Sequence, residues 1–134
     1  MSLQVLVSTM FQNKEEALML KMNINSNAVV INQCGEKIEE TRIIAMDGKH
    51  ITWVNSPERG LSKSRNLAIK NSDADICLIA DDDMIYIDNY EEIVLKAFKD
   101  IPEADLIAFQ VQTLERCSNQ AKKDKAKIYT SFRE

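Results

Sequence analysis

The sequence predicts an α/β fold in which helices flank a mainly parallel central sheet, with one β-hairpin added. Three observations carry this prediction. Apolar, β-prone runs alternate with segments of helical periodicity along most of the 134 residues. The run 74–80 is continuously apolar, which is typical of a strand covered on both faces. An Asp47-Gly48 step between two more β-prone runs indicates a tight hairpin turn.

The predicted elements follow from apolar periodicity and from the residues that bound each run. We expect strands at 3–10, 27–34, 41–46, 50–55, 74–80 and 104–113, and helices at about 14–22, 63–71 and 89–99. The strands 41–46 and 50–55 form the hairpin, and 74–80 is expected at the centre of the sheet. After 113 the chain is polar and is expected to be a solvated loop or frayed helix, with a basic run of Lys122, Lys123, Lys125 and Lys127.

Side chains before each helix suggest how the helices begin. Asn13 with Glu16, and Asp88 with Glu91, have the spacing of a capping box, and Ser62 is a third candidate cap. The helix at 89–99 is the most strongly patterned, because apolar residues recur on one face: Tyr90, Ile93, Val94, Ala97 and Phe98.

Composition excludes several classes of function. The length suits one domain, expected to span 1–134. A net charge of −4, from 17 basic and 21 acidic residues, provides no broad positive field, so a nucleic-acid partner is not expected. Three widely spaced cysteines without a CxxC pair favour a reducing, cytoplasmic location. We expect no signal peptide and no membrane span; any attachment to the inner membrane face would come through partners or further segments.

The acidic cluster Asp81, Asp82 and Asp83 follows directly on the most apolar strand. Two carboxylates about 4 Å apart repel by about 4 kcal/mol at an effective dielectric of about 20, so a cation is expected beside them. Alternation along a strand puts Asp81 and Asp83 on one side and Asp82 on the other. Paired carboxylates suit Mg²⁺ or Mn²⁺, and ligands of parallel sheets bind at the carboxyl ends of the strands. The alternative is that these residues cap a turn or point into water.

A longer stretch carries a family resemblance. The segment "RGLSKSRNLAIKNSDADICLIADDDMIYIDNY" resembles the core signature of glycosyltransferase family 2, whose members have the Rossmann-like GT-A fold. The matching residues are Gly60, Ser62, Arg65, Asn66, and Asp81 with Asp83. The first strand, which closes on Ser8 and Thr9, also resembles the opening strand of that family. The resemblance covers most of residues 3–113.

This resemblance implies transfer of a sugar from a nucleoside diphosphate to a saccharide, lipid-linked or protein acceptor. Asp83 would hold a divalent Mn²⁺ or Mg²⁺ ion that bridges the donor phosphates, and Asp81 would share the metal or hold the ribose. Ser8 and Thr9 would lie against the nucleotide. Arg65 would bind phosphate or, alternatively, form a salt bridge to the acidic cluster. Asn66 and Asp82 complete the predicted donor-binding set.

Two departures from the family pattern limit these expectations. Asn32 and Gln33 stand where the family usually has an acidic pair that reads the base; their amides would contact a uracil edge or form a plain polar strand end, so UDP is favoured without being fixed. No residue here is a candidate for the general base of the acceptor, and Glu115 has no surroundings that favour it. We expect that base and the acceptor site beyond this chain, and weak transfer by the chain alone.

Two other classes of function fit part of this pattern. A nucleotide-sugar-binding or partner-docking module without catalysis would keep the same donor site. A receiver domain is a third alternative, but it needs an acidic pair after the first strand, where Ser8 and Thr9 stand. His50 is the single histidine and lies at a hairpin edge, so a catalytic triad is not expected. Trp53 is expected to pack, and Cys77 to be a small buried hydrophobe.

Overall fold

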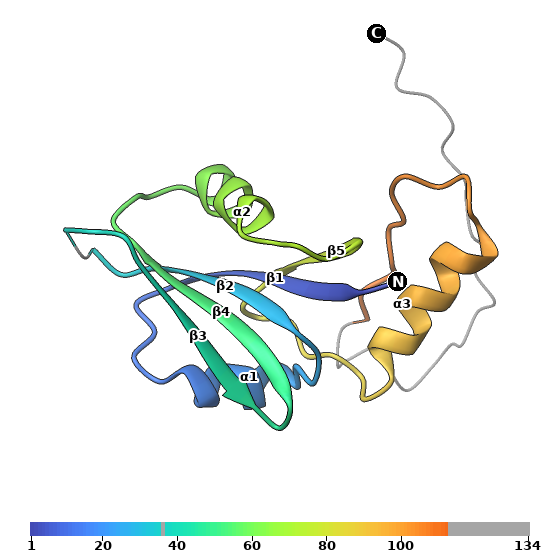
Figure 1. The fold of residues 1–134 in the computed structure, drawn as a ribbon, viewed down its shortest axis with the longest axis horizontal. Coiled ribbons are helices and arrows are strands. Elements are labelled where there is room, and N and C mark those ends of the chain that lie inside the picture. Colours follow the sequence, from blue (N-terminus) through green and yellow to red (C-terminus); the bar gives the residue numbers. More distant parts are fainter. Residues whose placement is uncertain (36, 113–134) are drawn as a thin grey trace, which may run out of the picture. The chain divides into compact units, whose positions relative to one another are not determined.

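The structure, a computed structural model, describes residues 1–35 and 37–112. Its elements, in chain order, are β1 (Leu3–Met10), α1 (Glu15–Met22), β2 (Ala28–Gln33), β3 (Glu40–Met46), β4 (Lys49–Ser56), α2 (Leu61–Lys70), β5 (Ile76–Asp81) and α3 (Tyr90–Asp100) (Figure 1). No helix in these residues is long and apolar enough to cross a membrane. The chain divides into two compact units, Met1–Leu95 and Lys96–Glu134.

The first unit contains one sheet of five strands in the order β3-β4-β2-β1-β5. Strand β1 lies between β2 and β5 and is parallel to both, and β4 is parallel to β2. Strand β3 runs antiparallel to β4 at one edge. The α/β fold class and the mainly parallel sheet are therefore confirmed, and they agree with a Rossmann-like GT-A fold.

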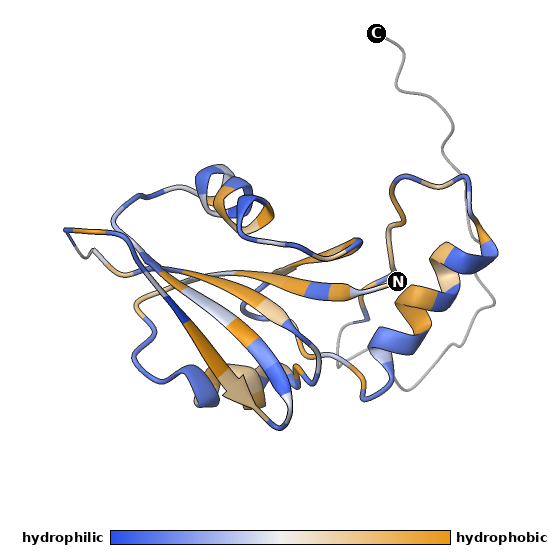
Figure 2. Ribbon diagram, viewed as in Figure 1, coloured by the Kyte–Doolittle hydropathy of each residue, from blue (hydrophilic) through white to orange (hydrophobic). Residues whose placement is uncertain are grey.

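Helices α1 and α2 cover opposite faces of this sheet (Figure 1). Helix α2 packs Ala68, with Leu67 beside it, onto a cluster formed by Leu6, Val29, Ile31 and Val54. The α1 layer contributes three buried side chains, from Leu18, Met19 and Met22. Hydrophobic residues accordingly follow the inner strands β1 and β2 in Figure 2. Coverage on both faces explains why β2 reads as one continuous apolar run.

The predicted hairpin is confirmed. Strands β3 and β4 pair antiparallel from Glu40↔Asn55 to Met46↔Lys49. The two residues between the strands, Asp47 and Gly48, have φ values of 48° and 76°. Two successive positive φ values match the twist of a two-residue hairpin turn, and Asp-Gly adopts them at low cost.

The apolar sequence of β5 predicted a strand at the centre of the sheet. That prediction was wrong, because β5 lies at one edge. Within the described residues it pairs only with β1. Its burial alternates: Ile76 and Ala80 are buried, whereas Ile79 is 49% exposed. Cys77 is exposed as well, so its prediction as a buried hydrophobe was wrong. An edge strand lacks neighbours on one side, and continuous apolar character alone does not reveal this.

The predicted helices exist, but the expected side-chain caps are wrong. The N-cap of α1 is Lys14, without a capping side-chain bond. Helix α2 begins two residues earlier than expected, after Gly60 with φ 113°, because that glycine provides the turn and places Ser62 inside the first helical turn. The Asp88 carboxylate accepts a hydrogen bond from Asn23 instead.

The prediction of a last strand at 104–113 is also wrong. Residues 104–112 form no strand, and the remaining residue, 113, lies outside the described part together with the lysines at 122–127. In this second unit Lys96 pairs with Asp100 at the end of α3, and the amide of Ala104 donates to the carbonyl of Ile101 (3.1 Å). Leu106 and Val111 are largely exposed. An apolar run becomes a strand only where a partner takes up its backbone hydrogen bonds.

Candidate functional site

The carboxyl ends of the four parallel strands lie along one edge of the sheet and carry polar side chains. The strand register places Ser8 beside Asp81, and Thr9 beside Asn32. Gln33 follows in the next row, beside Ser56 of β4. The structure thus brings together five of the residues that the sequence selected.

Thr9 belongs to a hydrogen-bonded chain that we call the Thr9 network: Thr9, Gln12, Asn32, Asn55 and Asp82. The Thr9 hydroxyl donates to Asp82 Oδ2 (2.8 Å), and Gln12 Nε2 donates to Thr9 Oγ1 (3.0 Å). At the far end Asn55 Oδ1 accepts from Asn32 Nδ2 (3.0 Å) and from the buried Trp53 indole (3.0 Å). The network joins the acidic cluster to β4 across three strands, and Trp53 packs as expected.

Both polar atoms of the Asn32 side-chain amide are hydrogen-bonded within the protein. Its side chain is 1% exposed; Oδ1 accepts from the amide of Gln12 (3.0 Å), and Nδ2 donates to the Gln12 carbonyl (2.9 Å). The amide group therefore bonds to Gln12 as a neighbouring strand would. This arrangement holds the chain that leaves β1 and corresponds to the polar strand-end alternative.

The residues on the α2 side form a separate set of contacts. Ser64 on α2 donates its hydroxyl hydrogen to Ser8 Oγ (2.8 Å). Gln33 Nε2 donates to the carbonyl of Gly60 (3.1 Å), just before α2 begins. These two bonds fix the start of α2 against the carboxyl ends of β1 and β2.

Arg65, on the same helix, forms the ion pair that the sequence left as one of two alternatives. Its Nη2 lies 3.1 Å from Asp81 Oδ1, with the two side chains 40% and 52% exposed. The Arg65 Nε is buried and has no hydrogen-bond partner among the described residues. An exposed pair of this kind contributes about 1 kcal/mol or less, so it is easily exchanged for another partner. Asn66, the next residue, is exposed, and its side chain has no hydrogen-bond partner among the described residues.

The acidic cluster spans the end of β5 and a turn. Asp81 is the last residue of the strand, and the turn closes when the amide of Met84 donates to the carbonyl of Asp81 (3.3 Å). Asp82 and Asp83 lie in this turn and not in the strand. The prediction that strand alternation puts Asp81 and Asp83 on one side therefore does not apply. Asp82 is bonded to Thr9, whereas Asp83 is exposed and bonds to none of the residues described.

These carboxylates fit a divalent metal only in part. The described residues contain no group of three or more His, Cys, Asp or Glu side chains that could hold a metal by itself. Asp83 and the second oxygen of Asp81 are available, and Mg²⁺ commonly takes one or two protein carboxylates, with waters and substrate phosphates as its other ligands. The donor set therefore fits a metal that arrives with a phosphate-bearing ligand.

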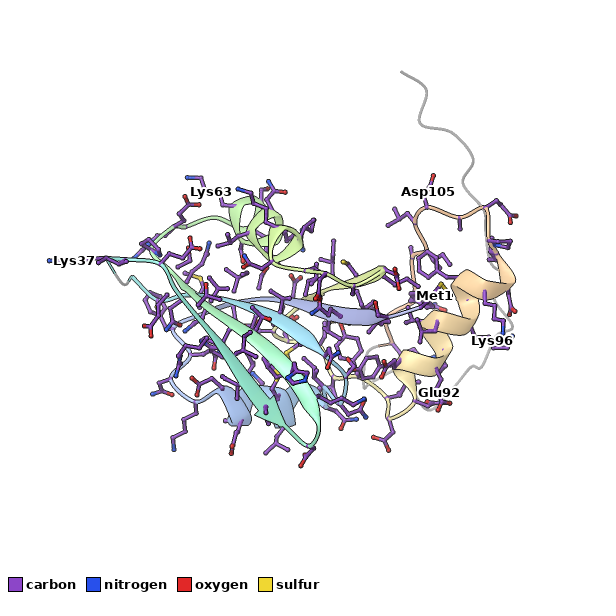
Figure 3. The ribbon with its side chains drawn as sticks, viewed as in Figure 1. Met1, Lys37, Lys63, Glu92, Lys96 and Asp105 are labelled. Atoms are coloured by element: carbon purple, nitrogen blue, oxygen red, sulfur yellow. The ribbon has the colours of Figure 1, made fainter. Side chains whose placement is uncertain are left out.

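Some residues at this edge were missed by sequence reasoning. Phe11 follows β1 with φ 51° and a side chain that is 62% exposed, while its amide donates to the Gln33 carbonyl (3.2 Å). Gln12 and Asn55 were also missed. The available signal for Phe11 was an aromatic residue two positions after Thr9, just beyond the end of the first strand. By contrast, Lys63 on α2 extends outward, away from the sheet (Figure 3).

A comparison with family models decides the family: the model described as glycosyl transferase family 2 matches residues 28–133. This chain belongs to glycosyl transferase family 2. The match includes Asn32, Gln33, Arg65 and the acidic cluster, and leaves β1 outside. Searches of curated proteins and of solved structures returned no match. The family resemblance seen in the sequence is thereby confirmed.

Proposed function

We infer that this chain takes part in glycosyl transfer from a nucleotide-sugar donor to an acceptor, which its membership of glycosyl transferase family 2 supports. Members of this family generally use a divalent metal. We propose that this chain binds a nucleoside-diphosphate sugar, with UDP favoured, together with Mn²⁺ or Mg²⁺ at Asp81 and Asp83. One observation carries the proposal: Asp83 is exposed and unbonded within the described residues, next to Asp82, which is anchored.

The chemistry of the proposed site follows from its charges. A bound divalent ion would offset the negative charge that develops on the pyrophosphate as the sugar leaves. Asp83 would hold the metal, and Asp81 would share it or hold the ribose. With a metal beside Asp81, the Arg65 guanidinium would be free to turn to a phosphate oxygen, and its buried Nε, unpaired among the described residues, would gain a partner.

The nucleotide would lie against the ends of β1 and β2. Ser8 and Thr9 line this edge, and the exposed Phe11 ring offers an apolar face for a base. Asn32 is already fully bonded. Within the described residues the Gln33 side chain is bonded through Nε2 only, so its Oε1 is the better candidate to accept a hydrogen bond from a uracil edge.

The acceptor side is not part of this proposal, since no described residue is a candidate for the general base. A non-catalytic donor-binding or docking module therefore remains the second proposal. Assays of sugar transfer and of donor hydrolysis on the full-length gene product separate the two. Reaction with an acceptor supports the transferase, and tight donor binding without either reaction supports the module. We propose a cytoplasmic location for both, from the cysteine pattern.

Thermal unfolding with UDP and Mn²⁺ tests the donor site. At a ligand concentration of about 100 times Kd, binding stabilises the folded chain by about 2.7 kcal/mol and raises Tm. Asp83→Asn is expected to lose this rise and to keep the ligand-free Tm, because the Asp83 carboxylate bonds to nothing in the described residues.

Asp73→Asn is the matched control, since Asp73 is also an exposed aspartate but precedes β5 instead of following it. It should respond to UDP and Mn²⁺ as the wild type does. The proposal is wrong if no nucleoside diphosphate with metal raises the Tm of the wild type, or if Asp83→Asn retains the full rise.

A further inference from the structure

The segment that leaves the acidic cluster is tied to the end of α1 by one asparagine. Asn23 is the C-cap of α1 and has a left-handed backbone, with φ 55° and ψ 44°. Its Nδ2 donates two hydrogen bonds, to the Tyr86 carbonyl (2.9 Å) and to Asp88 Oδ1 (2.8 Å). Both acceptors lie between the acidic cluster and α3. A single amide group thus fixes this segment at two points.

Neighbouring bonds reinforce the same attachment. The amide of Tyr86 donates to the Met22 carbonyl at the end of α1 (2.9 Å). Asn25 Nδ2 donates to the Asp88 carbonyl (3.1 Å). We call Asn23 and Asn25, with their acceptors in 86–88, the asparagine clamp. Its bonds link residues 63 and 65 positions apart in sequence, so they constrain the chain far more than local turn bonds do.

The other end of the acidic turn is held by different residues. Asp81 is part of β5, and Asp82 is bonded to Thr9. Asp83 therefore lies between two attached points, Asp82 before it and Tyr86 after it. Only residues 83–85 connect them, and so short a link has few conformations. A carboxylate held in this way loses less entropy when it binds a metal than one on a free loop.

We propose that Asn23 is a positioning residue that holds Asp83 in place for the metal and donor. The inference rests on the proposed donor site and adds a residue on another element, at the opposite end of the attached segment. Without the Asn23 bonds, repulsion within the acidic cluster and the freedom of 84–88 let Asp83 move away from Asp81. Partners that orient a metal-binding side chain typically contribute about tenfold or more to affinity.

The test measures binding of UDP and Mn²⁺ by calorimetry, with the paramagnetic resonance of Mn²⁺ as a second readout. Asn23→Gly removes the amide bonds and keeps a residue that adopts φ 55° without strain. We expect Kd to rise about tenfold. Asn23→Asp keeps the size of the side chain but removes both donated bonds, and should weaken binding in the same direction.

Asn71→Gly is the matched control. Asn71 is the C-cap of α2, and its Nδ2 donates to the Leu67 carbonyl (2.9 Å); in the described part of the chain it makes no bond to the acidic cluster. It should lower Tm, as Asn23→Gly does, and leave Kd unchanged. The inference is overturned if Asn23→Gly or Asn23→Asp binds as the wild type does, or if Asn71→Gly weakens binding equally. If the wild type itself does not bind, it is the proposed function that fails.

Discussion

At the scale of single residues, Asn32 shows how one side chain completes a strand edge. Its amide bonds to both backbone groups of Gln12 and to Asn55, and it is almost entirely buried. The family usually has an acidic residue at this position. In this chain a carboxylate would face two acceptor oxygens, the Gln12 carbonyl and Asn55 Oδ1. These two acceptors need the N–H groups of an amide at position 32, which a carboxylate lacks.

Asn32→Asp is expected to destabilise the fold by about 3 kcal/mol, because a buried charge replaces two donated hydrogen bonds. Urea unfolding at neutral pH measures the change. The control is Asn66→Asp, at an exposed position whose side chain bonds to none of the described residues, which should stay within about 0.5 kcal/mol of the wild type. Equal stability of the two variants would contradict this account of Asn32.

The candidate site was predictable from the sequence in part. Strand ends identify Ser8, Thr9, Asn32 and Asp81, because parallel strands present their carboxyl ends together. The partner of each side chain was not predictable. Asn55 meets Asn32 only because β4 lies next to β2, and no local pattern in the sequence gives that strand order.

At the scale of elements, the sequence predicted what depends on local pattern. Strands β1 and β2, the hairpin, and helices α1 and α3 lie within a residue or so of their expected bounds. The errors concern long-range pairing. Strand β5 was placed at the centre and lies at an edge, and 104–112 has the composition of a strand without pairing as one. Backbone hydrogen bonding between distant segments decides both cases.

Two tyrosine rings are in contact where the chain enters α3. The rings of Tyr86 and Tyr90 have centroids 4.7 Å apart and are tilted by 39°. Burial, together with the negative charges of ionised Tyr90 and of Asp81, raises the pKa of Tyr86 to about 12. Burial also raises the pKa of Tyr90, although its hydrogen bonds with Ser26 and Asn25 act against this rise.

These shifts predict a loss of stability in alkali. A folded pKa above the unfolded value of 10.0 means that stability is complete below pH 10 and falls as pH rises toward about 12. The free energy of unfolding of Tyr86→Phe should fall less steeply with pH, since the variant lacks one of the two ionising groups. The substitution breaks no hydrogen bond to a described residue, because the Tyr86 hydroxyl makes none. Urea unfolding across this pH range, with tyrosinate absorbance, provides the measurement. An identical pH dependence in the variant would contradict it.

At the scale of the whole molecule, charge sets a condition on donor binding. The chain carries a net charge of −4, and its proposed donor site has three consecutive aspartates. A nucleoside diphosphate is itself an anion. Arg65 is the cation paired with this cluster in the described residues, and it is already neutralised by Asp81. The donor and the protein therefore repel each other until a divalent cation is present.

Metal removal should accordingly abolish binding. In the presence of a chelator, UDP is expected to leave Tm unchanged, and an excess of Mn²⁺ or Mg²⁺ should restore the rise. Ionic strength is kept constant with sodium chloride, so that general screening does not differ between samples. An undiminished rise in the chelator would show that the donor binds without metal, and the metal role of Asp81 and Asp83 would be wrong.

The adjacent carboxylates Asp81 and Asp82 are bonded to different layers of the fold. Asp81 pairs with Arg65 on α2, and Asp82 bonds to Thr9 and so to the loop between β1 and α1. A substitution that alters the α2 layer thus leaves the Asp82 attachment intact, and the converse also holds. Asp81 and Asp82 therefore depend on separate attachments, even though they are neighbours in the chain.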